Sequence, residues 1–538
     1  MFKSIKRGFC CLFDCRLMSE HYFLWINLFL AVAILGHLVD ESIWIYGTLF
    51  FMICFLSPLR AILLTSIIFK IIKLLKIFPD VSDTERIALE AGDVWIDKSL
   101  FSGHPNINAL MKEPYPSLSK EENAFLSGPI EKLCSLCDEW QIYNDRDLPK
   151  EAWDFIKKER LFGMIIPKKY GGLGLSALGH SAVIQKISSV SATGAITVMV
   201  PNSLGPAELL IHYGSESQKK YYLPRLAKGE EIPCFALTEP TAGSDAGAML
   251  AEGIVFKKNN KIKIRLHFEK RWITLSGIST VLGLAFKCKD PDHLLSDTED
   301  AGITCALIPS STAGIDVSRR HDPMGIPFIN CPVIGKDVEI DIDQVIGEKA
   351  GIGEGWKMLM ECLSAGRGIS LPSLSTGGAK RALMTASSFA VVRQQFGLSI
   401  GRFEGIQDVL ARIVGYTYLM DAARVWTSAA VDQGYKPGVV SAIVKYWHTE
   451  LFRDTINDAM DIQGGAGISL GPKNLLGLVY MAAPIGITVE GANILTRNMI
   501  IFGQGALRCH PFAYNQIQAA QRNNLWEFDR AFWGHISR

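Results

Sequence analysis

The chain has 538 residues, of which 48% are hydrophobic, and its formal net charge is +1. This length allows about two to four domains, and the nearly neutral charge gives no indication of nucleic acid or of a strongly acidic partner. The 12 cysteines are scattered without a repeat, which favours reduced thiols over a disulfide framework. Cys134 and Cys137 form a lone CxxC pair with no further ligand residues nearby, so we expect a structural role for them and no metal site.

The N-terminal part of the chain is its most apolar part. Residues 22–39 and 43–59 are each about long enough to cross a hydrocarbon core. Basic residues precede the first stretch and follow the second, Arg60 among them, so the positive-inside rule places both ends in the cytoplasm. We therefore predict a two-span membrane hairpin. A lysine-edged helix at residues 67–78 would follow, either lying on anionic lipid or packing as a buried apolar helix.

Two kinds of periodicity divide the rest of the chain. Residues 262–268 alternate between apolar and polar side chains, and residues 302–308 are a β-rich run, so both are predicted strands. Beyond residue 351 a helical period returns, and five residues would line one helix face: Ile406, Leu410, Ile413, Thr417 and Met420.

These patterns predict an α+β fold. We expect the membrane hairpin and its basic helix at residues 1–79, an N-terminal helical domain at 80–233, a middle β-domain at 234–345, a C-terminal helical bundle at 346–510 and a tail at 511–538.

Two motifs far apart in the chain carry the candidate chemistry. Residues 236–248 (ALTEPTAGSDAGA) form a polar turn rich in small residues, where backbone can approach a flat ligand closely. Residues 488–493 (TVEGAN) present one carboxylate, Glu490, beside Gly491 and an apolar stretch. By its position alone, Glu490 suits a base and a carboxylate near a helix N-terminus equally well, because the helix dipole favours negative charge there.

In this order and over this distance, the two motifs resemble the acyl-CoA dehydrogenase family, and the resemblance covers residues 82–510. The apolar N-terminal stretches and residues 487–497 are most similar to the membrane-associated long-chain enzymes of Gram-negative bacteria. The resemblance implies FAD as cofactor and the conversion of an acyl-CoA, with long chains favoured, to trans-2-enoyl-CoA in the first step of fatty acid β-oxidation. In the family a glutamate removes the α-proton while the β-hydride passes to the flavin. This role falls on Glu490, with Arg367 as the arginine beside it.

The resemblance also assigns residues around the flavin ring. They are Thr238, Gly243 and Ser244 in the first motif, and Trp272 and Thr274 in a following strand. Trp272 and Thr274 flank one strand residue and would face the same side. On its own, Trp272 fits an ordinary core residue of the β-domain better.

Another group is assigned to the phosphate end of FAD. Arg393 and Phe396 belong to a helix-end motif whose arginine reaches the pyrophosphate across a subunit interface, and an arginine fork suits a diphosphate. Gly464 and Gly465 resemble a glycine cluster near the FAD phosphates or adenine, where backbone N–H groups can approach. The alternatives are a solvated helix end for Arg393 and a simple helix end for the glycines. The substrate would contact Ser244, Glu490 and Gly491.

The implied partners are acyl-CoA, an electron-transfer flavoprotein, membrane lipid and further copies of the chain, with the catalytic part on the cytoplasmic side of a bacterial inner membrane. Two other functions stay open. One is an acyl-CoA oxidase, in which oxygen reoxidises the flavin. The other is a membrane-tethered acyl-CoA-binding protein that has lost turnover.

Overall fold

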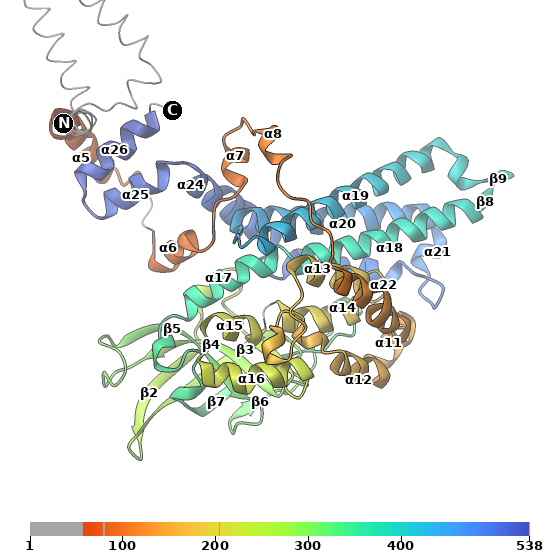
Figure 1. Ribbon diagram of the computed structural model, residues 1–538, viewed down its shortest axis with the longest axis horizontal. Coiled ribbons are helices and arrows are strands. Elements are labelled where there is room, and N and C mark those ends of the chain that lie inside the picture. Colours follow the sequence, from red (N-terminus) through yellow and green to blue (C-terminus); the bar gives the residue numbers. More distant parts are fainter. Residues whose placement is uncertain (1–56, 79–80, 204, 537–538) are drawn as a thin grey trace, which may run out of the picture. The chain divides into compact units, whose positions relative to one another are not determined.

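The computed structural model describes residues 57–78, 81–203 and 205–536, which belong to two compact units (Figure 1). The larger unit consists of residues 86–97 and 106–503. The predicted hairpin lies outside the described residues, apart from residues 57–59 at the end of its second span.

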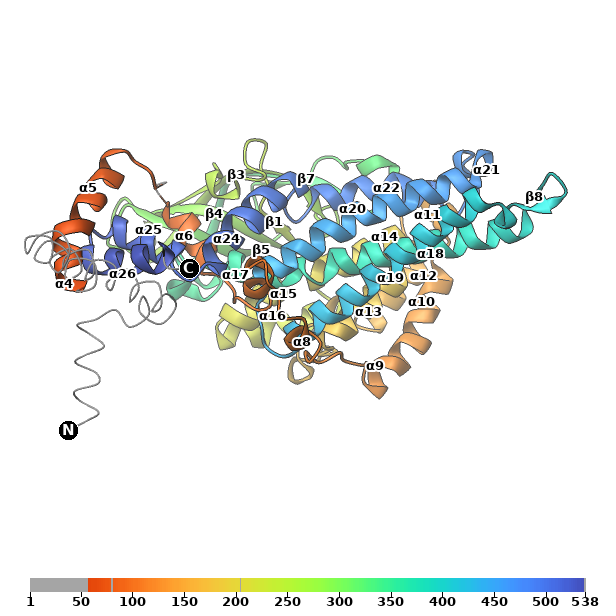
Figure 2. The ribbon, with the colours of Figure 1, turned by 90° about the horizontal axis from the view of Figure 1, so that it is seen from above.

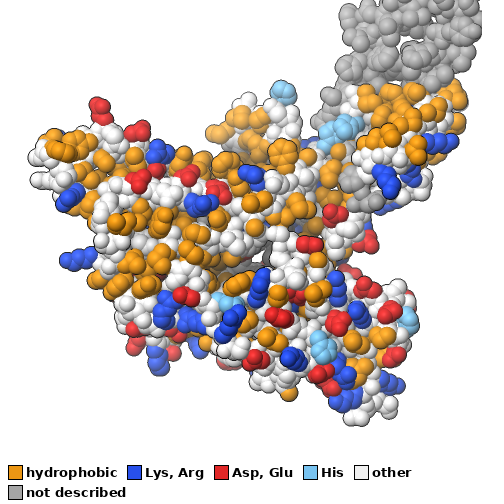
Figure 3. Space-filling view, turned by 180° about the vertical axis from the view of Figure 1, so that it is seen from behind, with side chains coloured by type: hydrophobic (Ala, Val, Ile, Leu, Met, Phe, Trp, Pro, Cys, Tyr) orange, Lys and Arg blue, Asp and Glu red, His pale blue; other side chains and the backbone are white. Residues whose placement is uncertain are grey.

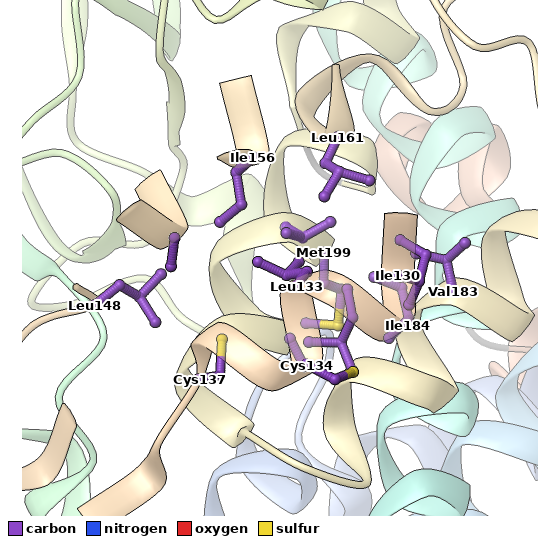
Figure 4. Packing of buried hydrophobic residues seen from close by; sticks show 14 of the residues in the cluster. Ile130, Leu133, Cys134, Cys137, Leu148, Ile156, Leu161, Val183, Ile184 and Met199 are labelled. Atoms are coloured by element: carbon purple, nitrogen blue, oxygen red, sulfur yellow. The ribbon is translucent and has the colours of Figure 1, made fainter. Parts of the chain in front are cut away.

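The N-terminal part of the larger unit is a set of short helices around an apolar core. Figure 4 shows Cys134 and Cys137 packed in this core with Leu133 and Met199, so both cysteines serve packing. Hydroxyl and carboxylate side chains cap the first turns of several of these helices, as Ser176 does for α13. The elements are α8 (Ile107–Leu110), α9 (Lys120–Phe125), η2 (Leu126–Ile130), α10 (Glu131–Leu136), α11 (Glu139–Asp145), α12 (Lys150–Lys158), α13 (Ala177–Ser188), α14 (Ala192–Met199), η5 (Val200–Asn202), α15 (Pro206–Tyr213) and α16 (Glu216–Lys228).

The middle part is a seven-stranded sheet with the order β1-β4-β2-β3-β7-β6, in which β5 pairs with β4. The predicted strands at residues 262–268 and 302–308 are confirmed as parts of β3 and β5. Residues 236–248, called here the flavin-side motif, begin at the last residue of β1, and helix α15 and the turn η5 pack against that strand. The strands are β1 (Pro233–Ala236), β2 (Glu252–Lys258), β3 (Lys261–Thr274), β4 (Val281–Lys289), β5 (Asp300–Pro309), β6 (Ile315–Asp316) and β7 (Asn330–Asp341).

The C-terminal part of the larger unit is a bundle in which α18, α19, α20 and α22 run side by side (Figures 1 and 2). The predicted helix face lies on α19, where Ile413, Thr417 and Met420 are buried. The elements are α17 (Gly355–Arg367), α18 (Ser370–Val392), β8 (Gln394–Gln395), β9 (Leu398–Ser399), α19 (Glu404–Asp432), α20 (Gly438–Gln463), α21 (Gly465–Ile468), α22 (Gly477–Thr488), α23 (Asn493–Leu495) and η11 (Thr496–Gln504). The larger unit therefore has helical, β and helical parts in the predicted order.

The smaller unit joins the two ends of the described chain. A helical segment runs from Ser57 to Leu74 and so begins earlier than the predicted helix at residues 67–78. It ends at Leu74, because Lys76 takes a left-handed φ of 48°. Arg60, which the sequence places among the flanking cations, is buried and binds Asp529 through Nη2–Oδ2 at 2.7 Å and Nε–Oδ1 at 3.1 Å. The elements are α4 (Ser57–Arg60), η1 (Ala61–Thr65), α5 (Ser66–Leu74), the start of α6 (Asp83–Glu90), most of α7 (Asp97–Phe101), α24 (Gly505–Cys509), α25 (Ala513–Gln521) and α26 (Leu525–Ile536).

The outer side of α5 is apolar with a basic edge. Ile67, Ile71 and Leu74 are exposed there, next to Lys70 and Lys73. Figure 3 shows hydrophobic and basic side chains gathered on this unit.

Long apolar helical stretches also occur further along the chain. Within the described part of the chain, the stretch Ala192–Tyr213 has the length and hydropathy of a membrane span, as does the bent pair Gly477–Thr488 and Asn493–Cys509 taken together. The apolar window of the first stretch is 82% buried inside the protein, as expected of a core helix.

Candidate active site

Glu490 lies in the short loop between α22 and α23, with its backbone in the left-handed region. Its φ is +55° and that of Gly491 is +90°. Ser203, just after η5, donates from Oγ to Oε1 of Glu490 at 3.1 Å. The other carboxyl oxygen, Oε2, is buried and has no hydrogen-bond partner among the described residues. The loop thus holds one carboxyl oxygen in place and leaves the other unsatisfied.

Arg367 ends α17 and lies against the same loop. Its Nε donates to the backbone carbonyl of Glu490 at 2.9 Å, so the guanidinium orients the backbone of the loop. Burial raises the pKa of Glu490, while the Ser203 hydroxyl and the charges of Arg367 and Lys445 oppose this rise. Burial also lowers the pKa of Arg367. The family resemblance places Arg367 beside Glu490, and the structure brings the two residues together.

Lys445 and Asn493 complete the surroundings of this loop, and the sequence reasoning missed both. Lys445, on α20, is fully buried and donates from Nζ to the carbonyl of Gly491 and to Oδ1 of Asn493, both at 2.7 Å. A single lysine within the apolar run 439–447 is a signal that could have been used, because a charged residue there must be buried. Ser203 carries no comparable signal.

The flavin-side motif is held by a buried ion pair. Lys270 is fully buried and Glu239 is 3% exposed, and their Nζ and Oε1 atoms lie 2.7 Å apart. Glu239 also accepts from the backbone N–H groups of Leu250 and Ala251. Lys270 further donates to the carbonyl of Leu237 at 3.0 Å. The pair therefore ties the loop after β1 to strand β3.

Three predicted flavin-side residues lie in this loop. Thr238 is half-buried, and its carbonyl accepts from the backbone N–H of Arg271 at 3.0 Å. Gly243 and Ser244 are exposed, and a Cβ added at Gly243 would meet open space. The loop therefore presents free backbone to a ligand, next to the end of β3.

Plain alternation does not hold at the end of β3, where Trp272 is exposed, Ile273 buried and Thr274 half-buried. The register shifts between Lys270 and Ile273, and Trp272 has a φ of +62°. Trp272 remains 54% exposed and its ring centroid lies 4.3 Å from that of His321. Left-handed backbone at a bulky residue is strained and occurs most often at functional sites. The exposed indole offers an aromatic face on which a flat ligand can stack.

The residues assigned to the phosphate end of FAD lie elsewhere in the unit. Arg393 and Phe396 are exposed at the β8–β9 hairpin, at the far end of α18 from Arg367 (Figure 1). Gly464 and Gly465 are exposed at the end of α20, about 28 Å along the helix from Lys445 at 1.5 Å per residue. A single copy of the chain therefore does not bring these four residues to Glu490.

Four domain families match the chain in succession. The acyl-CoA dehydrogenase N-terminal domain matches residues 130–230, its middle domain residues 234–338 and its C-terminal domain residues 353–503. The acyl-CoA dehydrogenase C-terminal domain of bacterial type matches residues 507–538.

Individual relatives agree with these matches. The chain is 28% identical over 375 residues to probable acyl-CoA dehydrogenase FadE10 of Mycobacterium tuberculosis, covering 69% of this chain and 56% of FadE10. It is 28% identical over 366 residues to the mitochondrial very long-chain specific acyl-CoA dehydrogenase of Homo sapiens, covering 67% of this chain and 55% of that protein. The chain thus spans a little over half the length of these relatives.

A solved structure shares the fold of the larger unit. The glutaryl-coenzyme A dehydrogenase in complex with glutaryl-CoA superimposes with a TM-score of 0.65 at 25% identity, covering 73% of this chain and 98% of that one. Together with the three successive domain matches, this shows that the chain belongs to the acyl-CoA dehydrogenase family.

Proposed function

We propose that this chain is an FAD-dependent acyl-CoA dehydrogenase in which Glu490 is the base that removes the α-proton of the substrate. One observation carries the proposal. Oε2 of Glu490 is buried without a hydrogen-bond partner, while Oε1 is held by Ser203. Buried carboxyl oxygens of purely structural residues are normally satisfied, so this unsatisfied one is well suited to receive a proton.

The electrostatics of the site suit this task. The α-proton of a thioester is a weak acid, and a carboxylate becomes a stronger base when its pKa is raised toward the working pH. Burial raises the pKa of Glu490, and the charges of Arg367 and Lys445 keep the ionised form accessible.

The loop also supplies a hydrogen-bond donor. The backbone N–H of Glu490 has no partner among the described residues, so it is free to donate to the thioester oxygen as negative charge develops there. One such donor contributes roughly 2.7–4 kcal/mol in other oxyanion sites.

The β-domain residues fit FAD. Trp272 offers an exposed aromatic face, Thr274 a half-buried hydroxyl, and Gly243 an open backbone for close approach. The chemistry that FAD supplies when bound is acceptance of the hydrogen and two electrons that leave the β-carbon. The work of this chain is to hold the thioester, take the α-proton and keep water from the carboxylate.

Substrate length, partners and location extend the same proposal. The similarity to the very long-chain enzyme of Homo sapiens supports a long-chain acyl-CoA as substrate, its product a trans-2-enoyl-CoA and its place the first step of fatty acid β-oxidation. An electron-transfer flavoprotein would accept the electrons.

The apolar and basic outer side of α5 supports attachment to the cytoplasmic face of a bacterial inner membrane. The exposed Arg393 and Phe396 support a homo-oligomer in which they serve the FAD of another copy.

Anaerobic titration of the detergent-purified holoenzyme with acyl-CoAs of graded length tests the proposal. We expect loss of the oxidised flavin absorbance, with an equivalent of enoyl-CoA formed and the greatest extent for long chains. Peroxide formed on admitting oxygen without another acceptor would identify an oxidase. A flavin that no acyl-CoA reduces would refute the proposal and leave a binding protein.

A further inference from the structure

Lys445 is a buried cation whose ammonium group makes no direct ion pair among the described residues, although the charges of Glu490 and Glu450 act on it at longer range. Its two hydrogen-bond acceptors are neutral oxygens, the Gly491 carbonyl and the Asn493 side chain. Burying an ammonium group costs several kcal/mol, and methionine would fill the same space without this cost. Stability alone therefore does not account for a lysine here.

The backbone that Lys445 contacts is strained. Glu490 has a φ of +55°, and the left-handed region costs a non-glycine residue about 1–2 kcal/mol. Such a conformation persists only where the surrounding structure fixes it. Arg367 donates to the Glu490 carbonyl, and Lys445 and Thr496 both donate to the Gly491 carbonyl, Thr496 at 3.0 Å. Three donors thus hold the two carbonyls at the strained turn.

Asn493 links Lys445 to the rest of α20. Its Nδ2 donates to Oγ1 of Thr449 at 2.9 Å and to Oε1 of Glu450 at 2.7 Å, while its Oδ1 accepts from Lys445. An ammonium group can only donate, so this network fixes the orientation of the Asn493 amide. The loop is therefore attached to α20 at two points, Gly491 and Asn493.

We propose that Lys445 is a positioning residue that, together with Asn493, locks the left-handed backbone of Glu490 and so aims its carboxylate. This inference rests on the proposed role of Glu490 as the base. Lys445 also acts on the Glu490 carboxylate through its charge. The charged groups acting on Glu490 are Arg367 from α17 and Lys445 from α20, and both lower its pKa. Burial lowers the pKa of Lys445 itself to about 8.

Two variants and a matched control separate these effects. Lys445→Met removes both the donor and the charge, whereas Asn493→Ala weakens the attachment of the loop and keeps the charge. Thr455→Val is the control, because Thr455 is buried on the same helix and donates only to Leu451. We measure the rate of anaerobic flavin bleaching by saturating acyl-CoA across pH, and hydrogen exchange of residues 485–497 in the holoenzyme.

We expect Lys445→Met to bleach about 10- to 100-fold more slowly, as a misplacement of about 1 Å would cause, with the acid limb of the pH profile moved to higher pH. In both variants, residues 485–497 should exchange hydrogen faster than in wild type. Asn493→Ala, however, should keep the acid limb of the wild-type pH profile. The control should change neither readout. Unchanged exchange and an unchanged acid limb in Lys445→Met would overturn the inference.

Two further results keep the test decisive. If Lys445→Met does not fold with bound flavin, the hydrogen exchange of Asn493→Ala decides alone. Exchange of residues 485–497 in Asn493→Ala at the wild-type rate would then overturn the inference. Bleaching by Glu490→Gln would refute the base itself, and with it the proposed function. Loss of bleaching in Glu490→Gln, with wild-type behaviour in Lys445→Met, would refute the positioning role only.

Discussion

The ion pair between Glu239 and Lys270 offers the sharpest test of how the flavin-side loop is held. Lys270→Met removes the cation and leaves the Glu239 carboxylate, 3% exposed, with only the backbone N–H groups of Leu250 and Ala251. The Leu237 carbonyl loses its donor as well. The variant should therefore weaken both the β-domain and its hold on the flavin.

The expected magnitude follows from the burial of both partners. Removing one member of a buried pair costs about 3–5 kcal/mol, because the remaining charge is left uncompensated. Lys258→Met is the matched control, since Lys258 pairs with Glu339 on the exposed side of the same sheet. Solvent screens that exposed pair, so it contributes little to stability. A double variant, Lys270→Met with Glu239→Gln, removes both charges but keeps an acceptor for the backbone, so it should recover much of the loss.

Urea unfolding of the holoenzyme, followed by release of the bound flavin, measures these differences. Lys270→Met should lower the midpoint far more than Lys258→Met, and the double variant should lie between Lys270→Met and wild type. A Lys270→Met midpoint no lower than that of the control would refute the reasoning, as would a double variant less stable than Lys270→Met.

Three further predictions concern other buried groups. Burial raises the folded-state pKa of Glu490 above its unfolded value of about 4.3, so the stability of wild type falls as pH rises through the raised pKa. Glu490→Gln should therefore have a higher urea midpoint than wild type at pH 7, and the two midpoints should converge at low pH. A difference in midpoint that persists at low pH would contradict this. Asp529→Ala removes the two hydrogen bonds that its carboxylate accepts from the buried Arg60, each worth about 1.5–3 kcal/mol. The smaller unit should therefore be cleaved faster in limited proteolysis near residues 57–78; unchanged cleavage would argue against the pair. Burial raises the pKa of Cys134 to about 11 and of Cys137 to about 12, so iodoacetamide should label them only after unfolding, and rapid labelling of the native protein would contradict their packing role.

Local patterns in the sequence predicted much of the fold. Alternation at residues 262–268 identified part of β3, and helical spacing identified the buried face of α19. The motif around Glu490 supplied a candidate base, and the resemblance to the family favoured that role and placed Arg367 beside it.

Contacts between distant segments could not be predicted in this way. Ser203 reaches Glu490 across 287 positions of the chain, and Arg60 reaches Asp529 across 469. The left-handed backbone of Trp272 depends on a register shift against β7 that no local spacing reveals. Lys445 lies in an apolar helical run, and only the fold shows that its ammonium group holds the turn at Gly491.

The central claim is that the unsatisfied carboxyl oxygen of Glu490 takes the α-proton. Its most direct test is the oxidised flavin absorbance of Glu490→Gln and wild-type holoenzyme, mixed anaerobically with the same long-chain acyl-CoA. The account predicts that wild type bleaches, whereas Glu490→Gln binds the acyl-CoA and keeps its oxidised spectrum. Full bleaching of Glu490→Gln would contradict it.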